Sequence, residues 1–239
     1  MRVNKYISEA GLCSRREADE WLLAGRVSIN GEVVGTGAKA LEGDEVRVDG
    51  EIVRARILAA TPAAKKAIYI ALNKPIGITC TTDQSVSGNI IDFVDHPQRI
   101  FPIGRLDKDS EGLILLTSNG DIVNEILRSE NHHEKEYLVG VNKAVTDEFL
   151  ADMAKGVFIH RQMTKPCRVR RIAKFGFSIV LTQGLNRQIR LMAAAFDYRV
   201  TQLRRIRINN IKLAHLKVGQ WRNLTEAELG GLLPERTQW

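Results

Sequence analysis

The sequence of 239 residues is poor in cysteine and in aromatic residues, and it contains no long apolar run. Its three cysteines lie far apart, so their spacing predicts neither a disulfide framework nor a zinc site. No segment approaches the ~18 consecutive apolar residues of a membrane span, and residues 1–10 lack the apolar core of a signal peptide. We therefore expect a cytoplasmic protein that does not enter a membrane.

Carboxylates are nearly absent from one long stretch of the chain. From Arg161 to His215 there are thirteen lysines and arginines but a single carboxylate, Asp197, and the whole chain carries a net charge of +7. So many cations repel one another on a compact surface unless a polyanion offsets the repulsion. Arginine predominates, and its forked guanidinium suits hydrogen bonding to phosphates. Since the stretch is also rich in apolar residues, it indicates a folded surface that binds nucleic acid rather than a solvated tail.

Residues 1–54 have the pattern of a small module with two short helices and two hairpins. Apolar residues recur at helical spacing near the N-terminus, and Ser14 with Glu17 matches a capping box that opens a second helix. Alternating strand-like segments then lead into the hairpin turns Asn30-Gly31 and Asp49-Gly50. A module of this length is near the lower size limit for an independent core.

Residues 55–67 are predicted to be a linker, because they combine small residues, a proline and charge without an amphipathic period. In residues 68–239 strands and helices do not alternate regularly, which favours an α+β fold over a doubly wound one. Strands are predicted at Ile68–Leu72, Leu113–Thr117, Tyr137–Val141, Phe177–Thr182 and Arg205–Ile208. Helices are predicted at Asp121–Arg128, Thr146–Lys155, Arg187–Phe196 and Thr225–Leu233.

One carboxylate, Asp107, stands in a tight loop directly before a buried strand. Its segment, Phe101–Gly112, is followed by the apolar residues Leu113–Leu116. Taken alone, an aspartate in such a loop is more often a turn or capping residue than a catalyst. The basic stretch downstream favours a chemical role, because a carboxylate in an electropositive cleft stays ionised at neutral pH.

The segment Gly104-Arg105-Leu106-Asp107 resembles the signature of RNA pseudouridine synthases. Three further segments match other motifs of that family in order: Leu72–Gly77, Lys135–Val139 and Gly184–Arg190. Residues 1–54 are similar to the S4 RNA-binding domain, so the resemblance covers nearly the whole chain. It implies a small N-terminal S4-like domain followed, over residues 68–239, by a catalytic domain with a mixed, mainly antiparallel sheet flanked by helices.

The resemblance also implies a reaction, the isomerisation of uridine to pseudouridine, and a substrate. Members with an S4 domain act on ribosomal RNA, and the segments around Asp107 and Tyr137 most resemble synthases of the peptidyl-transferase region of 23S rRNA. We expect a monomer that acts on this RNA, free or within a precursor particle. No cofactor is implied, and no metal is expected at His132-His133, because adjacent histidines point in different directions. Two alternatives remain: a non-catalytic S4-type ribosome assembly factor, and a synthase for small-subunit rRNA or tRNA.

Four residues of the catalytic domain receive roles through this resemblance. Asp107 would be the catalytic carboxylate, acting either as nucleophile or as base. Tyr137 would stack on the target base and accept or relay a proton. Arg190 would pair with Asp107 and keep it ionised, and Arg105 would help hold the target base outside its stack.

The last motif has helical spacing. Asn186 can cap a helix on which Arg187 and Arg190, three residues apart, share a face that can point into a cleft. Arg187 is therefore a further substrate-binding candidate. The family often follows Arg190 with a second basic residue, and Leu191 stands there instead, so no extra phosphate contact is expected at that position.

Contact of the first module with RNA is expected to be local, because the module carries more carboxylates than cations. The candidate RNA-binding cations there are Lys5, Arg15, Arg16 and Arg26. Arg15 and Arg16 fall in the first turn of a predicted helix, whose free N–H groups can share a phosphate with them. Lys74, in the first family motif, is a further RNA-binding candidate.

Overall fold

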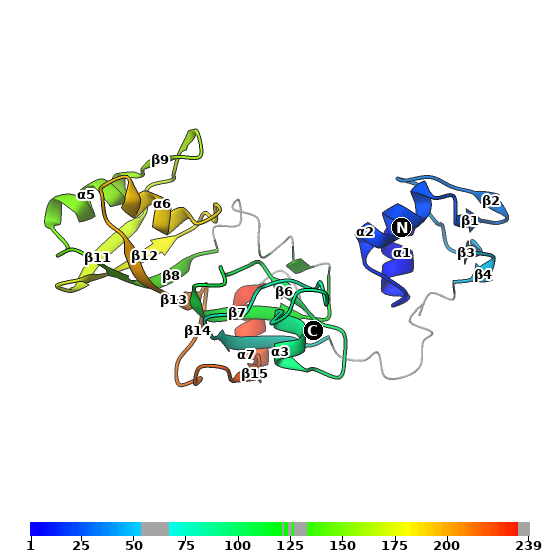
Figure 1. The fold of residues 1–239 in the computed structure, drawn as a ribbon. Coiled ribbons are helices and arrows are strands. Elements are labelled where there is room, and N and C mark those ends of the chain that lie inside the picture. The colour runs from blue at the N-terminus through cyan, green and yellow to red at the C-terminus, as the bar shows by residue number, and fades with distance from the viewer. Residues whose placement is uncertain (54–66, 121, 124–125, 127–132, 234–239) are drawn as a thin grey trace. The chain divides into compact units, whose positions relative to one another are not determined.

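The computed structural model describes residues 1–53, 67–120, 122–123, 126 and 133–233. The chain separates into two units, Met1–Lys65 and Lys66–Trp239, each with its own hydrophobic core (Figure 1). The predicted linker, residues 55–67, lies outside the described residues except for Ala67. No helix in the described part of the chain is long and apolar enough to cross a membrane.

The first unit contains the helices and hairpins that its sequence predicts. Ser14 and Glu17 form the expected capping box, and Asn30 and Asp49 take the positive φ of their hairpin turns. The strands pair in the order β2-β1-β3-β4, and the core lies between this sheet and the two helices. The elements are α1 (Val3–Glu9), α2 (Arg15–Leu23), β1 (Val27–Ile29), β2 (Glu32–Val33), β3 (Val46–Val48) and β4 (Glu51–Ile52).

The second unit is built on a sheet to which nine of its described strands belong. Its path is β11-β12-β8-β13-β7-β5-β15, with β14 paired to β13 and β6 to β7. The pair β13–β7 is parallel and the other pairs are antiparallel, so the predicted mixed, mainly antiparallel sheet is confirmed. The strands are β5 (Tyr69–Lys74), β6 (Phe101–Ile103), β7 (Glu111–Thr117), β8 (Lys135–Val141), β11 (Arg168–Ala173), β12 (Gly176–Leu181), β13 (Val200–Ile208), β14 (Ile211–Lys212) and β15 (Trp221–Asn223). A separate hairpin joins β9 (Phe158–Ile159) to β10 (Gln162–Met163).

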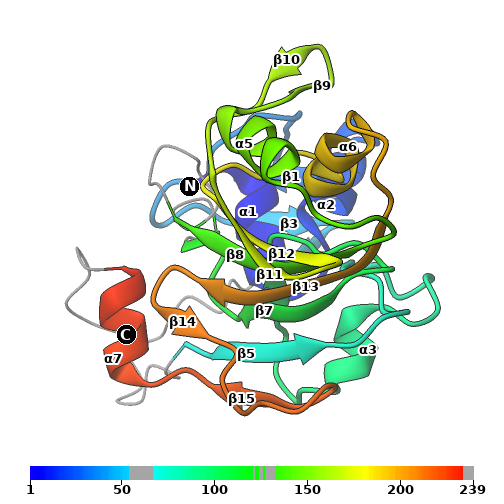
Figure 2. The same ribbon diagram turned by 90° about the vertical axis from the view of Figure 1, so that its left-hand side faces the viewer.

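Both faces of the central strands are buried, because successive side chains enter different cores. On β7, Ile114 and Leu116 face one core while Leu113 and Leu115 face the other. The helices α5 (Asp147–Lys155) and α6 (Gln188–Ala194) cover the first face over β8, β12 and β13, and α3 (Ile90–Val94) adds to the same core (Figure 2). The second face packs against α7 (Glu226–Leu232).

Two helices of the second unit begin at side-chain caps. Thr146 accepts from the N–H of Phe149 at the start of α5, and Thr225 and Glu228 form a capping box at the start of α7, where the helix was predicted to begin. Of the predicted helix at Asp121–Arg128, only residues 122, 123 and 126 are described.

The sequence pattern did not predict β11, because this strand lacks a buried side. It lies at the edge of the sheet and its side chains are almost all exposed, so its residues show no alternation of apolar and polar character.

The parallel contact between β7 and β13 depends on a glycine. Gly112 has φ +107°, and a Cβ built on it would lie 2.2 Å from the carbonyl oxygen of Arg205. Arg205 is its register partner on β13. Because Gly112 has no side chain, the two strands can approach, and β13 can lie between β7 and β8.

We predict that Gly112→Ala lowers the free energy of unfolding by about 2–4 kcal/mol, since it combines a strained φ with a backbone clash. Urea unfolding followed by circular dichroism measures the change. The matched control is Gly230→Ala inside α7, where a Cβ meets nothing within 4 Å, and it should raise the free energy of unfolding by about 0.5–1 kcal/mol. Equal stability of Gly112→Ala and the wild type would contradict the argument.

Candidate active site

Asp107 lies in the loop that joins β6 to β7. Gly104 opens this loop with φ +77°, and the N–H of Ser110 donates to the carbonyl of Asp107 at 3.1 Å. The loop is thus a hydrogen-bonded turn that ends directly at the buried strand β7, which holds its backbone in place. Asp107 remains partly exposed and lines a cavity.

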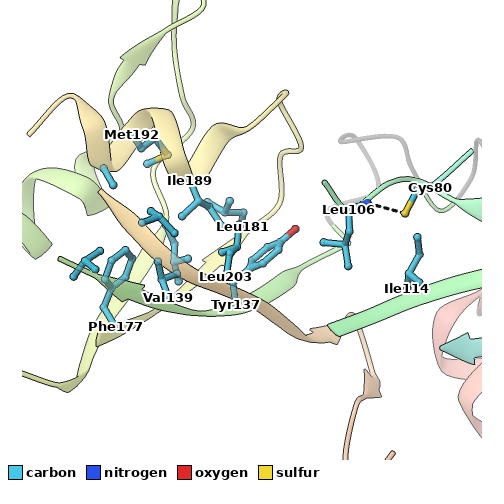
Figure 3. Close-up of a cluster of buried hydrophobic side chains, with 14 of the residues drawn as sticks. Cys80, Leu106, Ile114, Tyr137, Val139, Phe177, Leu181, Ile189, Met192 and Leu203 are labelled. Atoms are coloured by element: carbon cyan, nitrogen blue, oxygen red, sulfur yellow. Dashed lines mark hydrogen bonds between the residues drawn. The ribbon is translucent and has the colours of Figure 1, made fainter. Parts of the chain in front are cut away.

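A neighbouring loop holds the backbone on both sides of Asp107. The N–H of Leu106 donates to the Cys80 sulfur at 3.4 Å (Figure 3), and the carbonyl of Lys108 accepts from the N–H of Gly77 at 2.8 Å. Burial raises the pKa of the Cys80 thiol, so this sulfur stays a neutral acceptor. The first family motif therefore supports the loop that carries Asp107.

The structure corrects the expectation that Lys74 contacts RNA. Its side chain is fully buried, and its Nζ donates to the carbonyls of Pro75 and Ile78, both at 2.8 Å. Burial lowers the pKa of the ammonium. Lys74 shapes the 75–80 loop from inside, because a buried cation needs such hydrogen-bond acceptors.

Tyr137 lies on β8, where its ring is buried against the core. In Figure 3 the ring stands beside Leu181 and Leu203, and its hydroxyl points toward the side of Leu106. The hydroxyl accepts from Nη1 of Arg205 at 3.5 Å, and the two residues are register partners on β8 and β13. The sheet thus brings Tyr137 to the same region as the Asp107 loop.

A cavity of about 610 Å³ joins three of the four family motifs within the second unit. The cavity-lining side chains come from the Asp107 loop, from β8 and β13, and from the segment before α6. Four of the six catalytic-domain candidates line it: Arg105, Asp107, Tyr137 and Arg187. Its remaining polar lining consists of Ser110, Lys135, Gln183, Asn186, Gln188 and Arg205.

The predicted ion pair between Arg190 and Asp107 is wrong. Nη1 of Arg187 lies 3.7 Å from the Asp107 carboxylate, whereas Nη2 of Arg190 lies 3.2 Å from that of Asp109. Arg190 also donates to the backbone carbonyl of Asp109 at 3.0 Å and to the Ser110 hydroxyl at 3.3 Å. Arg190 therefore clamps the end of the loop.

The start of α6 explains this exchange of partners. Arg187, with φ +49°, is the N-cap residue, so the predicted cap by Asn186 is also wrong. The Asn186 carbonyl instead bonds His160 Nε2 at 2.9 Å. In this left-handed conformation Arg187 extends toward the Asp107 loop, and it lies 3.4 Å from Asp109 as well.

Two cavity-lining cations were not among the predicted site residues. Lys135 begins β8 and donates to the carbonyl of His133, and burial, with the nearby charge of Arg205, lowers its pKa to about 8. Arg205 lies on the same face of β13 as Leu203. An arginine at a core-facing strand position was the signal that could have found it.

The RNA-binding candidates of the first unit differ in their surroundings. Arg15 and Arg16 are exposed in the first turn of α2. Lys5 is ion-paired with Glu9, and Arg26 binds Asp49, which raises the pKa of the Arg26 guanidinium. Arg15 and Arg16 are thus the candidates that the structure leaves most accessible.

The cavity and its motifs agree with known proteins. A family model described as RNA pseudouridylate synthase matches residues 68–195, and an S4 domain model matches residues 1–46. The chain belongs to the RNA pseudouridylate synthase family. It is therefore an RNA pseudouridine synthase with an S4 domain, as the sequence motifs indicated. Among the described residues no group of three or more His, Cys, Asp and Glu side chains could hold a metal ion.

Relatives match over nearly the full chain. A dual-specificity RNA pseudouridine synthase RluF of Salmonella typhi is 53% identical over 95% of this chain and 77% of its own length. Ribosomal large subunit pseudouridine synthase B of Bacillus subtilis is 31% identical over 95% of this chain and 93% of its own. A crystal structure of a pseudouridylate synthase, 30% identical, superposes with a TM-score of 0.70 and covers 97% of this chain and 99% of its own.

Lys135 should make stability depend on pH. Its folded-state pKa of about 8 lies below the value of about 10.4 for an exposed lysine, so between these values the unfolded chain binds more protons. The free energy of unfolding therefore rises with pH across that window. We predict that Lys135→Met removes this rise, on the order of 2 kcal/mol after allowing for solvent screening.

Urea unfolding of both proteins at pH 7.5, 9 and 10 gives the difference directly, and other titrating groups cancel in the comparison. A difference between Lys135→Met and the wild type that stays constant with pH would show that Lys135 titrates as an exposed lysine.

Proposed function

We propose that this synthase converts uridine to pseudouridine in the peptidyl-transferase region of 23S rRNA, with Asp107 as its catalytic carboxylate. The observation that carries the proposal is that Asp107, from the β6–β7 loop, and Tyr137, from β8, line one cavity together with Arg105 and Arg187. The names of the relatives agree with a ribosomal target, since one refers to the large subunit. We further propose that the enzyme acts in the cytoplasm as a monomer, on free RNA or on a precursor particle.

The chemistry requires a carboxylate beside the sugar and the base. The bond between C1′ and N1 of the uridine breaks, the uracil turns, and C1′ bonds to C5, which then loses its proton. Asp107 can act as nucleophile at the sugar or the base, or as a base toward the sugar. Nη1 of Arg187, 3.7 Å from the Asp107 carboxylate, can help to orient that carboxylate on each route.

The remaining residues would hold the nucleotide. Tyr137 offers its ring for stacking and its hydroxyl for the C5 proton. Arg105 is exposed at the cavity and would take the place of the base in the RNA stack. Arg190 would act through the loop, because its contacts fix the Asp109–Ser110 end of the turn that carries Asp107.

A second RNA substrate has specific support. Several relatives at 51–53% identity are named dual-specificity synthases. We therefore propose transfer RNA as a second substrate, to be assayed beside 23S rRNA. An enzyme with activity on one RNA class alone would narrow the proposal to that class.

We predict that Asp107→Asn lowers kcat for pseudouridine formation at least 1000-fold on a 23S rRNA fragment, because the amide is neither nucleophile nor base, while RNA binding persists. Mass spectrometry of the digested RNA measures the product. Asp147→Asn is the matched control, the same change at an exposed carboxylate that does not line the cavity. Wild-type activity of Asp107→Asn would refute the assignment.

Arg15 and Arg16 should contribute to RNA affinity without touching the chemistry. We predict that the double variant Arg15→Gln, Arg16→Gln reduces the slope of log Kd against log salt by about 1–2, with kcat unchanged. Arg47→Gln, on β3 of the same unit and bonded to Glu45, serves as the control for loss of a cation. An unchanged salt slope in the double variant would remove both residues from the interface.

A further inference from the structure

Arg205 is a buried arginine with an unused donor. Its side chain belongs to a residue that is only 3% exposed and that lines the cavity beside Tyr137. Its Nε donates to the carbonyl of Leu113 at 2.6 Å, and Nη1 donates to the Tyr137 hydroxyl at 3.5 Å. Its Nη2 is shielded from water and has no hydrogen-bond partner among the described residues.

The burial of Arg205 is unfavourable unless another group accepts a hydrogen bond from its Nη2. Both partners of Arg205, a backbone carbonyl and a phenol, are neutral, and a buried cation with an unsatisfied N–H group is costly. The cavity itself is short of negative charge, because its lining contains Arg105, Lys135, Arg187 and Arg205 but a single carboxylate, Asp107. An electron-rich ligand would supply the missing acceptor.

The position of Arg205 indicates which part of the nucleotide supplies that acceptor. Arg105 and the half-exposed Arg187 lie where the cavity meets solvent, so Arg187 can receive a phosphate while Arg105 occupies the RNA stack. Arg205 lies deeper, bonded to the ring that would stack on the base. A base lying on Tyr137 would bring its carbonyl edge, rather than a phosphate, to this guanidinium.

We propose that Arg205 donates a hydrogen bond from Nη2 to a carbonyl oxygen of the target uracil and stabilises the negative charge that the base acquires during the reaction. This inference rests on the proposed function. When the C1′–N1 bond breaks, its electron pair passes to the uracil and is shared with O2 and O4. When C1′ bonds to C5, the C5 proton leaves to a base and N1 regains a proton.

This contact would make Arg205 a catalytic residue. A preorganised donor at a developing oxyanion contributes about 100- to 1000-fold in kcat in other enzymes. If the carbonyl is O4, the contact would also favour uracil over cytosine, whose C4 amino group presents a second donor instead of an acceptor.

The first test compares Arg205→Gln and Arg205→Lys with Arg204→Gln. This control removes the same charge at the preceding residue of β13, whose side chain points to the opposite face. We expect kcat to fall about 100-fold in Arg205→Gln, with partial recovery in Arg205→Lys, RNA Kd within threefold of wild type, and kcat of Arg204→Gln within twofold. Circular dichroism and thermal unfolding establish folding. A folded Arg205→Gln with kcat within threefold of wild type would overturn the proposal.

The second test changes the substrate and does not depend on Arg205→Gln being folded. Single-turnover rates are measured on RNA with 2-thiouridine or 4-thiouridine at the target, because sulfur is a weaker hydrogen-bond acceptor. We expect one of the two substitutions to slow the wild type at least fivefold and to slow Arg205→Lys much less, which also identifies the oxygen. Equal rates on all three RNAs, or losses that simply multiply in Arg205→Lys, would overturn the proposal.

These outcomes are separate from failure of the proposed function. A wild type without activity on 23S rRNA or transfer RNA would contradict the proposed substrate before Arg205 is tested. An active wild type with an equally active Arg205→Gln would contradict this inference alone.

Discussion

The close parallel contact between β7 and β13 determines where the chemistry of this enzyme can take place. Gly112 allows the Arg205 backbone to approach β7 directly after the Asp107 loop. The other edge of β13 pairs with β8, so Arg205 lies opposite Tyr137. One strand thus connects a carboxylate and an aromatic ring that are thirty residues apart in sequence. A side chain at position 112 would separate the strands and, with them, the two walls of the cavity.

Positive charge held inside the protein near the cavity is the second physical constraint on the site. Lys74 is compensated by two backbone carbonyls and shapes the loop that bonds both sides of Asp107. Lys135 donates to one backbone carbonyl, and Arg205 donates only to neutral groups. Burial lowers the pKa of Lys135. The fold therefore keeps positive charge in a region of low dielectric constant, where it acts strongly on a bound nucleotide. Arg187 adds charge at the cavity, and Arg190 holds the Asp109 end of the loop that carries Asp107.

Much of the fold could be predicted because local signals and tertiary packing agree. The capping boxes at Ser14 and Thr225 and the hairpin turn at Asn30 lie where the sequence places them. The buried strands β5, β7 and β12 were recognised from their apolar runs. In contrast, β11 is an exposed edge strand, and the short strands β6 and β15 gain their identity only from a neighbour that completes their hydrogen bonds.

The sequence by itself determined the family, the two-part organisation and the residue types of the site, because four motifs in order and an S4-like module specify them. Only the tertiary structure decided which residues of the site contact one another. It placed Arg187, not Arg190, beside Asp107, since the left-handed backbone at Arg187 directs its side chain to the loop. It buried Lys74 and brought Arg205 to Tyr137. Contacts between residues far apart in the chain depend on strand register and backbone approach, which no local pattern encodes.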